Sequence, residues 1–262
     1  MRLQILQQMA TYKKTGSKAK KGQNKIEDKS TTAEVFNTLD ETASRSEQFV
    51  IKNQNIIFII LGLIVAAVLG YLAYQKYVKG PQEKEAANEL AFPKAYFEDA
   101  MSNPVAVASL LTLSLNGADG KYGFIDIANN YNGTKAGNLA NYYAGISNLK
   151  LKNYKEAIEY LEKFSSNDEL LGPTAKGAIG DAFADINQPE DAFEYYLKAA
   201  NLRNNNFSTP FFLFKAGNTA MEIEKYSKAL DAFNRIKNEY PNSEEAKNID
   251  IYINKATFAL KK

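Results

Sequence analysis

Three residue types are missing from this 262-residue sequence, which contains no cysteine, no histidine and no tryptophan. Without Cys or His the chain has no disulfide, no thiolate nucleophile, no Cys/His zinc site and no Ser–His or Cys–His relay. The lack of thiols also removes the usual sequence sign of an oxidising or reducing compartment. Any catalysis would have to rest on carboxylates, amines, hydroxyls and tyrosines.

The composition is that of a globular chain whose charge is divided. Hydrophobic residues make up 45% of the sequence and charged residues 24%, and the length suits one or two domains. Residues 1–54 hold ten Lys or Arg against six Asp or Glu, whereas residues 80–262 hold twenty against twenty-four. A nucleic-acid-binding domain usually has the opposite sign, so we expect no nucleic-acid partner for the larger part.

One long uncharged run divides the chain. No charged residue occurs from Asn53 to Gln75, and residues 56–74 are almost wholly apolar. At about 1.5 Å per residue, such a helix crosses a hydrocarbon layer of roughly 30 Å. A buried core helix would not be apolar on every face, and a cleavable signal peptide would be shorter and nearer the start. The run therefore predicts a permanent membrane-spanning helix over residues 55–77, which makes the lipid bilayer one partner.

Charge leaves the orientation of this helix open. The lysines of the tail favour a cytoplasmic amino terminus, whereas within about twenty residues of the span two cations precede it and four follow it. Three small residues, Gly62, Ala66 and Gly70, recur every four positions on one face. This spacing predicts a face on which a second transmembrane helix packs closely, although small residues are common in membrane helices in any case.

The segments before the span predict a tail and a short helix. Residues 1–31 are mostly polar and basic, which predicts a disordered basic tail, and Met9 is a second plausible start of the protein. Apolar residues at three- and four-residue steps predict an amphipathic juxtamembrane helix over residues 32–54. Because that helix holds four acids and few cations, we expect it to pack on a partner helix rather than on a lipid surface.

After Pro81 the chain repeats itself with a period near thirty-five residues, which indicates stacked helix pairs. A glycine is followed twelve residues later by an alanine, and four residues further on by a large side chain. The three sets are Gly145, Ala157 and Leu161; Gly180, Ala192 and Tyr196; and Gly217, Ala229 and Phe233. Small residues let two helices approach, and the large side chain fills the adjoining gap. The predicted fold class is all-α.

This pattern resembles the tetratricopeptide repeat, whose motif has a small residue in the first helix, alanine and then an aromatic in the second, and a closing proline. The third set fits the motif and is followed by Pro241, but the middle set lacks the closing proline. The Trp of the motif is missing throughout. The resemblance implies a helical-repeat solenoid with three repeats over residues 138–241, so the predicted fold is a single transmembrane helix followed by this solenoid.

The remaining segments flank these repeats. Residues 78–137 predict a helical segment with a degenerate repeat, of which Phe124–Tyr131 is the second helix. Pro93 predicts a kink or a break within that segment. Residues 242–262 predict a last helix that caps the stack.

The order of tail, anchor and repeats over residues 32–262 is similar to that of the YfgM-type tetratricopeptide proteins of bacterial inner membranes, in a form typical of the Bacteroidota. The resemblance implies a single-pass inner-membrane protein with a cytoplasmic amino terminus and a periplasmic repeat domain. It also implies association with subunits of the Sec translocon and with the membrane-anchored chaperone PpiD. It carries over no catalytic residue and no cofactor.

The first helix of each pair, projected onto the inner face of a solenoid, predicts a polypeptide-binding groove. Its members are Tyr142, Ile146 and Leu149 at one end, Phe211, Phe214 and Met221 at the other, and Asp181 and Asp185 between them. A groove that is apolar at both ends and acidic in the middle suits an extended or helical polypeptide with some basic character. The alternative is that several of these side chains only pack against neighbouring helices.

These patterns leave three hypotheses for function. The first is a non-enzymatic adaptor or chaperone, ancillary to the Sec translocon, that binds emerging client polypeptides; the second is a scaffold subunit of another envelope-assembly or secretion machine. The third is an enzyme with paired carboxylates, such as Asp181 with Asp185 or Glu190 with Asp191. Acids on helical surfaces are usually solvated, and no phosphate-binding loop accompanies these, so we predict no enzyme, no cofactor and no metal site.

Overall fold

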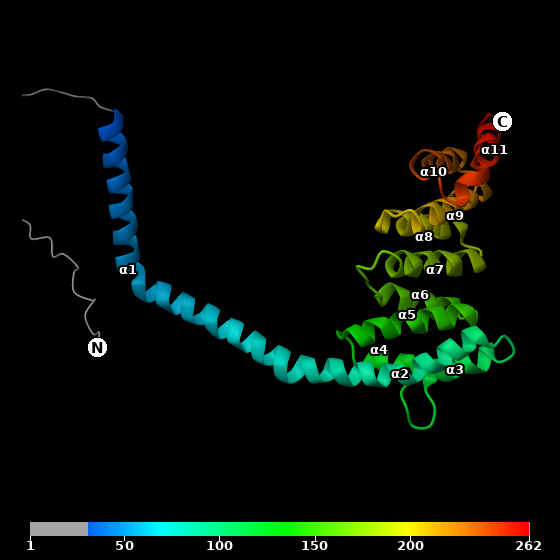
Figure 1. Ribbon diagram of the computed structural model, residues 1–262, viewed down its shortest axis with the longest axis horizontal. Helices are drawn as coiled ribbons and strands as arrows, with labels where there is room; N and C mark the ends of the chain where they lie inside the picture. The colour runs from blue at the N-terminus through cyan, green and yellow to red at the C-terminus, as the bar shows by residue number, and fades with distance from the viewer. Residues whose placement is uncertain (1–30, 262) are drawn as a thin grey trace, which may run out of the picture. The chain divides into compact units, whose positions relative to one another are not determined.

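The computed structural model describes residues 31–261 and gives side chains from Glu47 onward. Over this range the protein is helical, and its one β-type pairing is an isolated bridge between Ala118 and Lys121, so the predicted all-α class is confirmed (Figure 1). The chain divides into two units, one that ends at Ala67 and one that begins at Val68. Apart from Thr31, the segment for which a disordered tail is predicted lies outside the described residues.

The first helix, α1 (Thr31–Tyr74), is continuous over 44 residues and contains the apolar run. The division expected between a juxtamembrane helix and a spanning helix, at residues 54 and 55, is not a break in the helix. No Pro or Gly lies between Thr31 and Leu61 to interrupt it.

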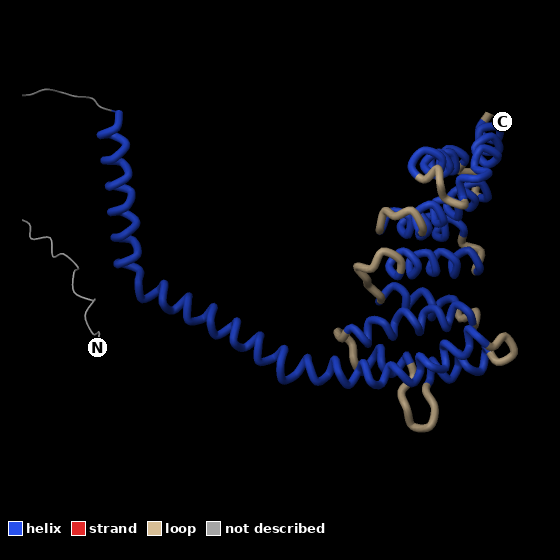
Figure 2. The backbone as a smooth tube through the Cα atoms, viewed as in Figure 1, coloured by secondary structure: helices blue, strands red, loops and turns tan. Residues whose placement is uncertain are grey.

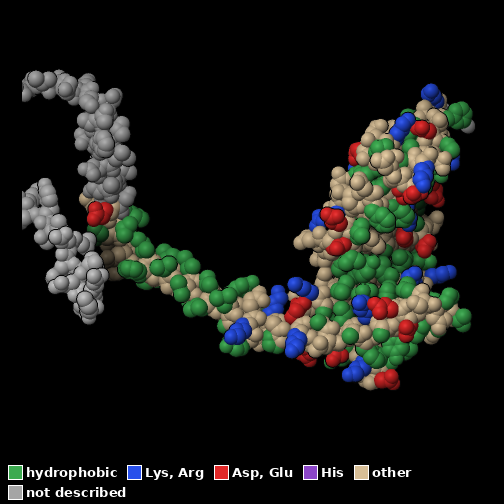
Figure 3. All heavy atoms as spheres, viewed as in Figure 1, with side chains coloured by type: hydrophobic (Ala, Val, Ile, Leu, Met, Phe, Trp, Pro, Cys, Tyr) green, Lys and Arg blue, Asp and Glu red, His purple; other side chains and the backbone are tan. Residues whose placement is uncertain are grey.

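The apolar run of α1 is exposed along its length. Among the described residues, one helical stretch is long and apolar enough to cross a membrane by length and composition, with a mean hydropathy of 2.9 in its most apolar 18-residue window. None of that window is buried in the protein. Figure 3 shows hydrophobic side chains along this helix.

A π-helical turn and a second helix continue the chain. In the turn η1 (Gln75–Lys79), the N–H of Gly80 donates to the carbonyl oxygen of Gln75. Helix α2 (Gly80–Ser102) contains Pro93 without ending there, so of the kink or break predicted at this proline, the break does not occur. The ring of Pro93 is fully buried, and this packing offsets the backbone hydrogen bond that proline cannot donate.

Ten further helical elements follow α2 in the described residues. They are α3 (Val107–Asn116), α4 (Phe124–Asn130), α5 (Lys135–Lys150), α6 (Tyr154–Lys163), α7 (Leu171–Asp185), α8 (Pro189–Leu202), α9 (Ser208–Glu222), α10 (Tyr226–Glu239), the 3-10 turn η2 (Glu245–Asn248) and α11 (Ile249–Leu260). From α5 onward, each helix packs against the next one along the chain. Figure 2 shows these helices stacked and joined by loops.

The helix pairs pack as the repeat spacing predicts. A Cβ added to Gly145 would lie 2.4 Å from Cγ of Leu161, and one added to Gly217 would lie 2.3 Å from Cε1 of Phe233. The equivalent distance from Gly180 to its partner, the ring of Tyr196, would be 2.7 Å. Because atoms this close would overlap, each glycine is needed for its pair of helices to approach. The three alanines of the pattern are completely buried (Ala157, Ala192 and Ala229).

The segment before the first repeat packs in a similar way. Phe124 and Ile127 of α4 are completely buried, and Phe124 stacks on Tyr143 of α5 with ring centroids 5.0 Å apart. The carboxylate of Glu83 in α2 accepts hydrogen bonds from the backbone N–H of Lys135, at 2.8 and 3.0 Å, and so caps the start of α5. Helices α2 and α4 therefore close one end of the array.

The turns inside the three helix pairs each contain a residue with left-handed backbone conformation. Lys152, Asn187 and Glu224 have φ values of 65°, 60° and 58°. Asn adopts this conformation readily, whereas Lys and Glu pay about 1–2 kcal/mol for the contact between Cβ and the backbone. Two of the three turns are therefore strained.

Lys152→Gly is expected to raise the free energy of unfolding by about 1 kcal/mol, because glycine removes the strain. Lys152 is exposed, so no packing is lost. The matched control is Lys155→Gly, at an exposed position inside α6, which should lower the free energy of unfolding by up to about 1 kcal/mol. Urea unfolding measures both, and destabilisation by Lys152→Gly would contradict the strain.

Candidate functional site

Two helices of the array begin beside one another with side-chain caps. Before α7, Oδ1 of Asp168 accepts hydrogen bonds from the N–H groups two and three residues further along, each at 2.8 Å. These two bonds lower the pKa of the Asp168 carboxyl group. Before α9, Oδ1 of Asn205 accepts from the N–H groups two and three residues further along, at 2.9 and 2.7 Å. The caps fix the two loops that enter α7 and α9.

A cavity of about 410 Å³ lies at these helix starts, and we call it the Phe207 cavity. The start of α7, the loop and first turns of α9, and the segment entering η2 all contribute to it. Its lining residues are Leu170, Thr174, Asn206, Phe207, Ser208, Phe211, Phe212, Asn242, Ser243, Glu244 and Glu245. Two successive repeats and the segment that follows them therefore build one cavity.

The apolar side chains that line the Phe207 cavity are mostly open to solvent. Phe207 is 76% exposed, Leu170 46% and Phe211 45%. Phe212 is buried and meets Phe211 edge to face, with ring centroids 5.1 Å apart. Large apolar side chains that gather in a concave surface mark a site where another molecule binds.

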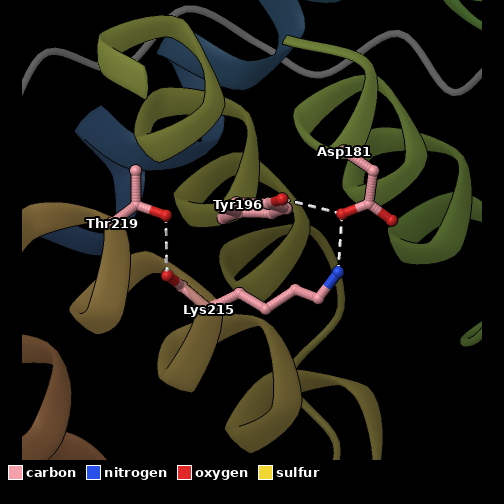
Figure 4. Close-up of polar contacts among 4 residues, drawn as sticks. All are labelled: Asp181, Tyr196, Lys215 and Thr219. Atoms are coloured by element: carbon pink, nitrogen blue, oxygen red, sulfur yellow. Dashed lines mark hydrogen bonds and ion pairs between the residues drawn. The ribbon is translucent and has the colours of Figure 1, made fainter. Parts of the chain in front are cut away.

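A polar network joins two adjacent repeats (Figure 4). Oδ1 of Asp181 in α7 accepts a hydrogen bond of 2.7 Å from the hydroxyl of Tyr196 in α8 and forms an ion pair of 2.6 Å with Nζ of Lys215 in α9. Thr219 donates to the backbone carbonyl oxygen of Lys215 at 3.0 Å. Nζ of Lys215 also lies 5.4 Å from the ring centroid of Phe211, a cation–π contact. Asp181 is thus a link between repeats, with both of its partners in the same chain.

The network predicts a dependence of stability on alkaline pH. Burial raises the pKa of Tyr196, and the nearby Asp181 carboxylate raises it further. The folded protein therefore holds the phenolic proton more tightly than the unfolded chain. The stabilisation is complete below the unfolded pKa of 10.0 and is lost as the pH rises above that value.

Tyr196→Phe is accordingly expected to flatten the fall in melting temperature between about pH 9 and about pH 11, even if it lowers the melting temperature at neutral pH. Asp181→Asn should flatten the same fall in part, because it removes the charge that opposes ionisation of Tyr196. Thermal unfolding across this pH range measures both. A slope in Tyr196→Phe equal to that of the unchanged protein would contradict the assignment.

The acidic pairs considered for catalysis have other surroundings. Asp181 already binds Tyr196 and Lys215, and Asp185, the last residue of α7, is exposed beside Tyr154, whose pKa it helps to raise. Glu190 and Asp191 lie in the first turn of α8, where carboxylates stabilise the helix start. Within the described residues, no group of three or more acids could hold a metal ion.

The residues predicted to line a groove fall into three environments. Tyr142, Ile146 and Leu149 are half-buried and pack against the hydrophobic cluster between α6 and α7. Phe214 is half-buried against the cluster formed by α8 to α11. Met221 packs against that cluster too and also lines a second, more polar cavity of about 720 Å³. Of the predicted apolar residues, Phe211 alone lines the Phe207 cavity.

Sequence reasoning missed Leu170, Phe207 and Glu245. They belong to loops and to a 3-10 turn, where no helical period marks an inward face. An available signal was the four phenylalanines within residues 207–214, directly after the three asparagines of residues 204–206.

The small residues of α1 lie on an open surface. A Cβ added to Gly62 or to Gly70 would meet no atom within 4 Å. The face that includes Gly62, Ala66 and Gly70 is exposed in the described part of the chain.

Three stretches of the chain match models of the tetratricopeptide repeat, one for each helix pair. Residues 139–168 and 212–243 match one such model, and residues 173–206 match another. Residues 139–168 overlap the pair α5–α6, residues 173–206 the pair α7–α8, and residues 212–243 the pair α9–α10. A comparison with curated proteins found no match. The protein thus carries one long apolar helix followed by a tetratricopeptide-repeat array, a fold that serves as a protein-interaction scaffold and is typically non-catalytic.

Proposed function

We propose that this protein is a membrane-anchored, non-enzymatic adaptor that binds other polypeptides through its repeat array. One observation carries the proposal. A helix whose most apolar 18 residues are not buried occurs in the same chain as a repeat array with an open cavity lined in part by apolar side chains. Apolar surface in water costs about 25 cal/mol per Å², so both surfaces call for a covering partner. A bilayer suits the helix, and a polypeptide suits the cavity.

In this proposal the protein is a single-pass protein of a bacterial inner membrane, with a cytoplasmic amino terminus and a periplasmic array. It works beside the Sec translocon and a PpiD-like chaperone, and its clients are emerging polypeptides. The support is the resemblance in segment order to the YfgM-type proteins. The open face with Gly62, Ala66 and Gly70 supplies a surface on which a partner's transmembrane helix packs.

The same proposal assigns the predicted groove residues to client contact, with Tyr142, Ile146, Leu149, Phe214 and Met221 as apolar contacts. Their half-buried side chains leave part of each surface open. Phe211 is 45% exposed, and Asp181 and Asp185 add negative charge between the two ends.

Site-specific photocrosslinking in intact membranes tests the binding function. A photoreactive amino acid at Tyr142 or Phe214 is expected to capture polypeptides, and the same group at Val105, 97% exposed on a loop before α3, is the control. Uncrosslinked protein at both groove positions, or equal capture at Val105, would contradict the proposal.

The second candidate function is a scaffold for another envelope-assembly or secretion machine, and the open anchor and array suit it equally. Affinity purification from gently solubilised membranes separates the two candidates. Sec subunits should co-purify under the first proposal. Subunits of a different membrane complex, without Sec subunits, would favour the second.

A further inference from the structure

The Phe207 cavity carries negative charge in addition to its apolar side chains. Glu244 and Glu245 line it, and none of its lining residues is Lys or Arg. Lys247 pairs with Glu244 at 2.5 Å, whereas Glu245 is half-buried and forms no ion pair within residues 47–261. Glu245 therefore lines the cavity without a cationic partner in the described part of the chain.

The helix starts at the cavity do not offset this charge. The first turns of α7 and α9 would ordinarily attract an anion through their unpaired N–H groups. At each start, the first N–H of the helix and the N–H of the residue before it are already bound, by Asp168 at α7 and by Asn205 at α9. Asp168, which caps the start of α7 and does not line the cavity, is itself a carboxylate whose pKa is held low by these hydrogen bonds.

A second cation, beside one of the lining side chains, is also occupied. Lys215 lies 5.4 Å from the ring of Phe211, but its Nζ is held by Asp181 at 2.6 Å. The exposed rings of Phe207 and Phe211 provide apolar area together with faces that attract a cation. The cavity thus combines a place for an apolar side chain with a negative charge that has no cationic partner in the described part of the chain.

We propose that the Phe207 cavity selects a polypeptide segment in which an apolar side chain stands next to Lys or Arg. The apolar side chain lies against Phe207, Phe211 and Leu170, and the cation pairs with Glu245. The inference rests on the proposed function, since it names the kind of segment that the array binds. It adds a specificity that the repeat fold does not provide by itself.

Fluorescence anisotropy with the full chain in lipid nanodiscs tests this selection. The probes are three fluorescein-labelled peptides: a Leu-Phe pair flanked by lysines, the same pair flanked by glutamates, and a Ser-Ser pair flanked by lysines. The first is expected to bind at least about tenfold more tightly than either of the others, and its binding should weaken as salt is raised.

Two variants locate the binding. Phe207→Ser and Glu245→Gln should each weaken binding of the basic Leu-Phe peptide by about five- to tenfold. Val105→Ser and Glu194→Gln are the matched controls, because both side chains are exposed and lie outside the cavity, and they should bind as the unchanged protein does. Equal melting temperatures of the four variants show that the fold is kept.

Equal binding of the basic and acidic Leu-Phe peptides would overturn the inference, as would binding unaffected by Phe207→Ser and Glu245→Gln, or no binding of any peptide. Each of these results is separate from the proposed function. If photocrosslinking at Tyr142 or Phe214 still captures polypeptides, the adaptor proposal stands without this selectivity. If photocrosslinking captures nothing, the adaptor proposal and the selectivity inference both fail.

Discussion

Leu61→Arg combined with Val65→Arg is expected to move the protein out of the membrane fraction. Both side chains are exposed near the middle of the predicted span, so neither substitution disturbs packing within the described chain. Each arginine at the centre of a membrane helix costs about 2.5–3.5 kcal/mol, and the pair therefore costs about 5–7 kcal/mol. A span with this penalty is not expected to insert.

Alkaline extraction followed by centrifugation measures the effect. The unchanged protein should remain in the pellet, and the double arginine variant should appear in the supernatant or be degraded. Leu61→Ala with Val65→Ala is the control and should stay in the pellet, because alanine carries no charge. A double arginine variant retained in the pellet would show that the apolar run does not anchor the chain.

Phe233→Ala is expected to lower the free energy of unfolding by about 3–5 kcal/mol, the usual cost of removing a buried aromatic side chain. Phe233 is completely buried, packs against Gly217, and its ring centroid lies 5.5 Å from that of Tyr252. Because each repeat of an array contacts only its neighbours, the loss should be concentrated in α9, α10 and α11.

Urea unfolding gives the size of this loss, and amide hydrogen exchange gives its location. Exchange should accelerate in α9 to α11 and change little in α5 and α6. Phe207→Ala is the control, because its ring is mostly exposed, and it should change stability by less than about 0.5 kcal/mol. A uniform loss of protection across all repeats would contradict the nearest-neighbour description.

The contact between Gly217 and Phe233 makes a further test of the repeat packing possible. Gly217→Ala should cost about 1–3 kcal/mol, because the added Cβ would lie 2.3 Å from the ring. Adding Phe233→Leu should recover part of that loss, since the shorter side chain vacates the space. Gly172→Ala is the control and should cost less, because its Cβ would meet Cδ2 of Leu202 at 3.1 Å and the carbonyl oxygen of Ser166 at 3.2 Å, longer distances than the one to Phe233. Strictly additive effects would contradict direct contact.

The repeat packing could be predicted from the sequence because it is local. Gly217 and Phe233 are sixteen residues apart, and helical geometry within one pair brings them together. The role of Asp181 could not be predicted in the same way. Its partner Lys215 lies 34 residues further along, in the next pair, and the period of a single helix carries no information about that contact.

The Phe207 cavity escaped prediction for a related reason. Leu170, Phe207 and Glu245 reach one surface through loops whose paths depend on the caps formed by Asp168 and Asn205. Such caps could be recognised only once the helix starts were known. In the apolar helix, by contrast, composition alone was sufficient, because no packing within the described chain is required to make it long and apolar.

Protease digestion of intact spheroplasts tests most directly whether a transmembrane helix carries this array on the outer side of the inner membrane. Tags placed before Met1 and after Lys262 report the two sides. The account predicts that external protease removes the carboxyl-terminal tag while the amino-terminal tag survives in the membrane pellet. Protection of the carboxyl-terminal tag until detergent is added, or loss of both tags from the membrane after alkaline washing, would contradict it.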